Sequence, residues 1–176
     1  MYKKKILIFE DTLSGHRLEY LNHIYEGATE KPDVKFIFAV PSDFIKIKDK
    51  LIWNKAENVV FHFFKKDEIN KKTSAISNSF YKSRLVKKIV LEYSIDEVFL
   101  ISLMHFLPFI TFLIPSRVKI SGIIYLIYLY RWKYSSIVLK IQDYTKYLLL
   151  SKRNNFKRIF LLNDKSAPLF LNKKFV

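Results

Sequence analysis

The sequence contains no cysteine among its 176 residues, and only three glycines and five prolines. Without cysteine, the chain forms neither disulfides nor thiolate metal sites and has no thiol nucleophile. The scarcity of glycine and proline leaves little room for flexible linkers. Because 50% of the residues are hydrophobic, the composition is that of a folded chain and not of a disordered one. We therefore expect one globular domain with a sizeable core.

Acidic residues are also few: 16 aspartates and glutamates stand against 31 lysines and arginines, which gives a formal net charge of +15. A charge of this size attracts polyanions and anionic membrane surfaces. Only six of the basic residues are arginines, and no segment interleaves arginine with aromatic residues as nucleic-acid readers do. We therefore expect no specific nucleic-acid partner, whereas an anionic membrane surface stays open as a partner.

The longest apolar segment, residues 98–114 (VFLISLMHFLPFITFLI), has 17 residues and is shorter than the ~20 residues of a usual transmembrane helix. The favoured interpretation is a buried strand up to Ser102 that continues into a hydrophobic core helix, with Pro108 in its first turn or at a kink. A helix lying in the plane of a membrane and a true span are the two alternatives.

Apolar runs alternate with helix-compatible segments along the whole chain. The runs predict strands at residues 6–9, 34–40, 59–64, 97–102, 119–125 and 158–162, and helices from about His16 and over residues 42–52, 73–93 and 134–150. In the third helix, one stripe holds Ile76, Phe80, Leu85, Ile89 and Tyr93. This alternation predicts an α/β fold, with a single Rossmann-like domain, a mostly parallel sheet of about six strands and helices on both faces.

The first strand and helix, KKKILIFEDTLSGHRLEYLNHI, contain the densest group of polar candidates for a binding site. Because open α/β sheets bind ligands at the carboxyl ends of their strands, Glu10, Asp11, His16 and Arg17 are the first candidates. Gly15 is either a turn residue or a point where a ligand approaches the anion-favouring start of the helix. The two acids also have a simpler explanation, because carboxylates stabilise a helix start.

Three further residues follow other predicted strands at the same edge. His105 follows the fourth strand, Arg131 the fifth and Asn163 the sixth. Together with the first loop they would line one polar cleft, although no catalytic dyad stands out and His105 could equally be a buried, hydrogen-bonded histidine. The sequence has no GxGxxG or GxxxxGK[ST] motif and no histidine spacing typical of zinc sites, so we predict neither a bound nucleotide cofactor nor a metal in this domain.

Four segments, ILIFEDTLSGHRLEYLNHI, IDEVFLIS, VKISGIIY and FKRIFLLNDKSAPLFL, resemble the N-terminal domain of bacterial glycosyltransferases of the GT-B type. The resemblance covers essentially all of residues 1–176. It implies a Rossmann-like domain that binds the acceptor, whereas a C-terminal domain absent from this chain would bind the nucleotide-sugar donor.

The resemblance implies a hexosyltransferase-like enzyme whose acceptor half, inactive alone, is this chain. Its partners would be the missing C-terminal domain and a glycan or lipid-linked acceptor, and its location the cytoplasm, at the inner face of the membrane for a lipid-linked acceptor. Gly15 and His16 would face the interdomain cleft, and His105 would have a general role in it. The loop reads SGH, where a double glycine is common in the family.

Two alternatives remain from the sequence. A flavodoxin-like or receiver-like regulatory domain shares the alternation of strands and helices, and its acidic pocket would correspond to Glu10 and Asp11. The third predicted strand, however, ends in FHFFKKDE without the aspartate that a receiver needs at that point. A basic polyanion-binding α/β domain is the other alternative, and it predicts binding that weakens steeply with salt.

Overall fold

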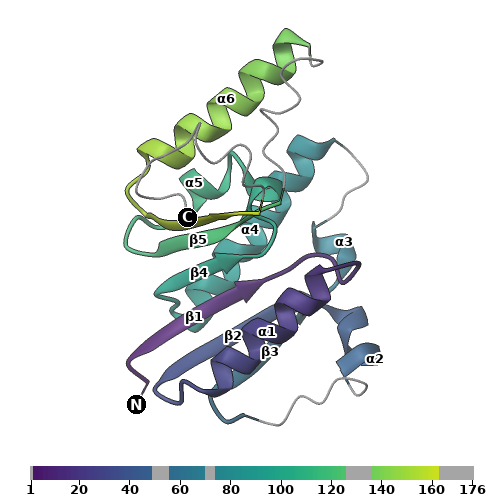
Figure 1. Cartoon of the computed structure of the whole chain (residues 1–176), viewed down its shortest axis with the longest axis vertical. Helices are drawn as coiled ribbons and strands as arrows, with labels where there is room; N and C mark the ends of the chain where they lie inside the picture. The colour runs from purple at the N-terminus through teal and green to yellow at the C-terminus, as the bar shows by residue number, and fades with distance from the viewer. Residues whose placement is uncertain (1, 49–55, 70–73, 126–135, 163–176) are drawn as a thin grey trace.

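A six-stranded parallel sheet forms the centre of the computed structural model, which describes residues 2–48, 56–69, 74–125 and 136–162 (Figure 1). Its order is β3-β2-β1-β4-β5-β6, and each neighbouring pair is parallel. The strands are β1 (Lys4–Phe9), β2 (Val34–Pro41), β3 (Val59–Phe64), β4 (Glu97–Leu100), β5 (Lys119–Ile124) and β6 (Phe156–Leu161). The predicted α/β, Rossmann-like fold is thereby confirmed.

The strand order also decides between two kinds of doubly wound sheet. A Rossmann fold has the order 3-2-1-4-5-6, whereas flavodoxin and receiver domains have the order 2-1-3-4-5. In this chain β1 lies between β2 and β4. The flavodoxin-like or receiver-like alternative is therefore wrong.

Helices cover both faces of the sheet (Figure 1). The longer ones are α1 (Arg17–Thr29), α4 (Ala75–Tyr93) and α6 (Ile137–Lys152). The short ones are η1 (Ser42–Phe44), α2 (Ile45–Lys48), α3 (Lys66–Ile69), η2 (Leu103–Phe106) and α5 (Ile110–Leu113). The helix predicted over residues 42–52 is thus a 3₁₀ turn followed by one α-helical turn up to Lys48, and its remainder lies outside the described residues.

Two hydrophobic cores lie on opposite faces because successive side chains of a strand point to opposite sides. On one face, Ile8 and Phe38 pack with Leu21 and Tyr25 of α1. The other, larger core joins odd-numbered β1 residues to α4, α5 and α6, and it contains Leu7, Phe9, Val86, Ile89, Ile110, Tyr147 and Leu150. The unbroken apolar runs of the sequence reflect this burial on both faces.

The buried face of α4 matches the stripe expected from the sequence only in part, at Leu85 and Ile89. Ile76 is 59% exposed, and the buried positions are Ser79, Ser83, Leu85, Val86, Ile89 and Val90. Two serines replace large apolar residues in this stripe because their hydroxyls donate to the neighbouring chain: Ser79 Oγ to the carbonyl of Leu107 and Ser83 Oγ to that of Phe106, both at 3.0 Å. Hydrogen bonding therefore determines the orientation of the N-terminal half of α4.

Residues 98–114 belong to the core, but the predicted strand ends two residues before Ser102 and no continuous helix follows it. Strand β4 ends at Leu100, η2 follows, and a cis bond between Leu107 and Pro108 separates η2 from the single turn of α5. Ten of the 17 side chains are buried, whereas Phe112 is 59% exposed. The transmembrane interpretation is therefore wrong for this segment, and no helix within the described residues is long and apolar enough to cross a membrane.

Candidate functional site

The candidate site lies where β1 and β4 end side by side, at the point where the strand order reverses. The backbone N–H of Glu10 donates to the carbonyl of Ala39 at 3.2 Å, and that of Ile101 donates to the carbonyl of Phe9 at 3.2 Å. The β1–β2 and β1–β4 ladders thus continue one residue beyond β1 and β4, to Glu10 and Ile101, and Ser102 follows directly. In open α/β sheets this is the position where ligands bind.

Glu10 is a buried acid with a full set of hydrogen bonds and is only 1% exposed. Its Oε1 accepts the backbone N–H groups of Asp11 and Thr12, both at 2.9 Å, and its Oε2 accepts the hydroxyl of Ser102 at 3.1 Å. Burial and, next, the charge of Asp11 raise the pKa of Glu10 to about 8, although Arg17 opposes the shift. Glu10 is therefore mainly protonated at neutral pH.

Asp11, the next residue, is ionised, and the side chains of Lys82 and His105 lie beside its carboxylate. Its Oδ2 forms an ion pair with Nζ of Lys82 and lies 3.7 Å from Nδ1 of His105. Burial opposes ionisation, but His105 and Lys82 outweigh it and hold the pKa of Asp11 well below its usual range. The Oδ1 atom has no hydrogen-bond partner. The pair of acids therefore combines a neutral carboxyl group with a carboxylate that has a free acceptor.

Arg17, at the start of α1, joins this cluster from the other side. Its Nη1 lies 3.5 Å from Oε1 of Glu10 and 3.9 Å from Oδ1 of Asp11. Its guanidinium carbon also lies 5.7 Å from the ring centroid of Tyr125, which follows β5. The carboxyl ends of β1, β4 and β5 and the start of α1 therefore meet around Glu10 and Asp11.

The turn that contains His105 is fixed to α4. The serine hydroxyls of α4 bind the carbonyls of residues 106 and 107, and the N–H of His105 donates to the carbonyl of Ser102 at 3.1 Å. Lys82 projects from the same helix, between these two serines. Helix α4 therefore positions both Lys82 and the imidazole of His105.

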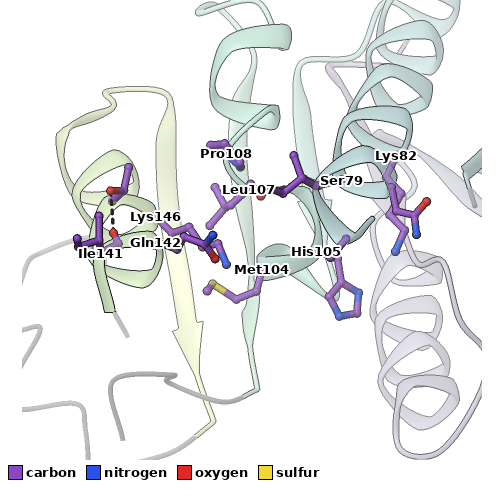
Figure 2. Close-up of a pocket in the computed structure, with 13 residues that line it drawn as sticks. Ser79, Lys82, Met104, His105, Leu107, Pro108, Ile141, Gln142 and Lys146 are labelled. Atoms are coloured by element: carbon purple, nitrogen blue, oxygen red, sulfur yellow. Dashed lines mark hydrogen bonds between the residues drawn. The ribbon is translucent and has the colours of Figure 1, made fainter. Parts of the chain in front are cut away.

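Two cavities border the cluster. One, of about 520 Å³, lies between α4 and α6 above residues 104–108, and Lys82 and His105 lie on one wall with Gln142 and Lys146 opposite (Figure 2). The other, of about 320 Å³, is lined by residues 11–14 and by Pro41, Asp43, Ile47 and Lys66. Asp11 therefore forms part of the wall of the smaller cavity, while its partners Lys82 and His105 line the larger one.

The structure brings together four of the predicted site residues: Glu10, Asp11, Arg17 and His105. Gly15 and His16 are exposed, and Nδ1 of His16 lies 3.1 Å from Oε2 of Glu19 on the helix surface. Gly15 has φ +63°, so it is a turn residue in a conformation that glycine favours. Whether these residues bind a ligand stays a prediction.

Two further predicted residues, Arg131 and Asn163, lie outside the described residues. Across the ranges that the structure does describe, no three histidine, aspartate or glutamate side chains are grouped so that they could hold a metal ion.

Lys82 and Ser102 belong to the cluster but were not among the site residues predicted from the sequence. Lys82 lies three residues after Ser79 and four before Val86, so helical spacing places it on the buried stripe. Because the chain has 31 basic residues, this spacing was the signal that could have distinguished Lys82 from the lysines of the solvated surface. Ser102 was expected to end a strand, and its role depends on the β1–β4 pairing, which no local pattern reveals.

Comparisons with known proteins support the fold. Neither a protein-family model nor a curated protein matches the chain. Among solved structures, it is similar to a Listeria monocytogenes protein with a provisional assignment as UDP-N-acetylglucosamine 2-epimerase, with a TM-score of 0.57 and 9% identity. The match covers 97% of this chain and 42% of the other, so the chain spans less than half of that protein's length. The similarity establishes the Rossmann-like fold.

Proposed function

We propose that this chain is the acceptor-side, N-terminal domain of a GT-B type glycosyltransferase. The complete enzyme would transfer a sugar from a nucleotide-sugar donor to a glycan or lipid-linked acceptor, at the cytoplasmic face of a membrane. The donor would bind to a second domain, so the chain would not transfer sugar alone. The cleft between the domains would lie at the carboxyl ends of the strands, where ligands of Rossmann-like domains bind.

The observation that carries the proposal is the buried charge cluster at the point where the strand order reverses. A neutral Glu10 and an ionised Asp11 lie side by side there, and His105 lies between Asp11 and an open cavity. Sugar transfer to a hydroxyl requires a group that accepts its proton, and a histidine that lies beside a buried carboxylate and lines a cavity is a candidate for that role. The similarity in fold to a protein assigned as UDP-N-acetylglucosamine 2-epimerase, whose name specifies a sugar nucleotide, supports a role in the chemistry of sugars.

The test is a transfer assay with the full product of the reading frame that contains this chain. It would be incubated with a panel of radiolabelled nucleotide sugars and membrane extract. Wild type should label the acceptor fraction, and His105→Ala should reduce kcat at least tenfold while donor affinity is retained, because the proposed donor site lies on the other domain. His23→Ala is the control, since that histidine is exposed on α1, where its Nδ1 lies 3.4 Å from Oε2 of Glu26. Equal activity of both variants would overturn the role of His105.

A basic polyanion-binding domain is the second candidate, favoured by the net charge of +15. It predicts that the isolated chain binds heparin or RNA with an affinity that falls steeply as salt rises. It also predicts that Asp11→Asn does not weaken this binding, because lysines distributed over the surface would bind the polyanion. If the full protein transfers no sugar and the chain binds polyanions in this manner, the second candidate replaces the first.

A further inference from the structure

We propose that the 520 Å³ cavity between α4 and α6 binds the phosphate-bearing head of a lipid-linked acceptor together with the first carbons of its chain. This inference rests on the proposed function and specifies its acceptor. A volume of this size is within the usual range for ligand pockets, which combine mainly apolar walls with a few polar groups.

The apolar part of the cavity fits a hydrocarbon chain. Met104, Leu107 and Pro108 line it between the two helices, and Ile76 of α4 and Ile141 of α6 line it from opposite walls. These two isoleucines are 59% and 61% exposed, although β-branched aliphatic side chains are usually buried. A hydrocarbon chain that lies between them would remove both side chains from water.

The polar part of the cavity fits an anion. Its charged or titratable lining residues are Lys82, His105 and Lys146, and no carboxylate is among the described lining residues. Asp11 pairs with one side of the Lys82 ammonium group, which has three donors in all. The first turn of α4, at Ala75 and Ile76, also lines the cavity, and the start of a helix favours negative charge.

The surface next to the cavity is apolar as well. On α6, Ile137, Ile141, Tyr144 and Leu148 are 75%, 61%, 57% and 37% exposed, and their spacing places them on one face of the helix. Only Ile141 of these four is among the residues that line the cavity. An apolar helix face on a strongly basic chain is typical of proteins that contact anionic membranes. A lipid-linked ligand could therefore enter the cavity directly from the bilayer.

The test uses methionine as a reporter, because the chain has two methionines and Met104 lines the cavity. The chain labelled with ¹³C-methyl methionine would be titrated with octyl phosphate below its micelle concentration, with 1-octanol and with inorganic phosphate. We expect a saturable shift of the Met104 signal with octyl phosphate. Octanol lacks the phosphate group and inorganic phosphate lacks the hydrocarbon chain, so each should bind at least tenfold more weakly than octyl phosphate.

Two matched variants distinguish the cavity from the helix surface. Ile141→Glu should abolish the Met104 shift, whereas Ile137→Glu, one turn earlier on the same exposed face, should retain it. Both positions are exposed, so both variants should fold. The proposal is overturned if octyl phosphate leaves the Met104 signal unchanged, or if the two variants respond alike.

Vesicles separate a specific lipid from a general anionic surface. Vesicles with a few per cent of a prenyl phosphate should capture more wild-type chain than phosphatidylglycerol vesicles of equal charge, and Ile141→Glu should remove this difference. Equal capture by both kinds of vesicle overturns the specific site and shows that general attraction to an anionic surface explains the binding. These assays need no donor domain. Failure to bind octyl phosphate while the full protein transfers sugar to a soluble glycan therefore contradicts this inference alone, and binding without sugar transfer contradicts the proposed function alone.

Discussion

The hydroxyl of Ser102 donates to Oε2 of Glu10 at 3.1 Å, which links the ends of two adjacent strands that are 92 positions apart in the sequence. The bond is buried, and it reaches a carboxyl group that burial and the neighbouring charge of Asp11 keep mainly protonated. The strand ends are thereby connected through side chains as well as through the backbone ladder.

Glu10→Gln should change how stability depends on pH. In the folded chain Glu10 keeps its proton up to about pH 8, whereas its ordinary pKa is 4.5. Between these values the folded state binds a proton that the unfolded state releases, so this group lowers the free energy of unfolding as pH rises, by up to about 1.4 kcal/mol per pH unit. Glutamine lacks this proton. In urea unfolding at pH 5 to 9, the free energy of unfolding of the variant relative to wild type should therefore rise up to about pH 8 and stay constant above it.

Glu30→Gln, at the exposed end of α1, is the control for the loss of a carboxylate in general. A stability difference between Glu10→Gln and wild type that stays constant from pH 5 to 9 would show that Glu10 ionises normally in the folded chain.

Asp11→Asn should destabilise the fold by about 3 kcal/mol, because it leaves the largely buried Lys82 ammonium without its counterion. Lys82→Met removes the other member of the pair and keeps a side chain of similar length. In the double variant no buried charge of this pair remains, so its loss of stability should be well below the sum of the two single losses. Chemical denaturation of the four proteins measures this coupling, and simple additivity would mean that the two side chains do not interact.

Gly122→Ala should be severely destabilising. A Cβ atom at this position of β5 would lie 2.6 Å from the backbone oxygen of Leu100, and the strand would have to move away from β4. We expect a loss of about 3 kcal/mol or more. Gly27→Ala in α1 is the matched control, because a Cβ atom there has no neighbour within 4 Å and alanine favours a helix by about 0.5–1 kcal/mol over glycine. Thermal melts of the two variants should shift in opposite directions.

The sheet was predictable because each strand is an unbroken apolar run, and the parallel order followed from the helical segments between the runs. Residues 98–114 were less predictable, since a continuous apolar run does not distinguish a helix from a strand followed by tight turns. Two serines from α4 hydrogen-bond the carbonyls of Phe106 and Leu107. These tertiary hydrogen bonds give the two backbone carbonyls of the turn the partners that they would otherwise find within a helix.

About half of the candidate site was predictable. Glu10, Asp11, Arg17 and His105 follow from the rule that binding residues lie at the carboxyl ends of strands. Lys82 comes from the middle of a helix, where a lysine in a basic chain is usually on the solvated surface. The sequence also gave no sign that Gly15 has a positive φ, so a bulky residue there would strain the loop as well as fill it.

The two serines of α4 also have a mechanical consequence. One helix carries Lys82 directly and the imidazole of His105 through the bound turn, so both side chains have the same support, while Asp11 follows β1. A ligand that pushes on α4 from the cavity would displace both side chains from the carboxylate together. Occupancy of the cavity and the charge balance at the sheet edge are thus coupled through a single rigid element.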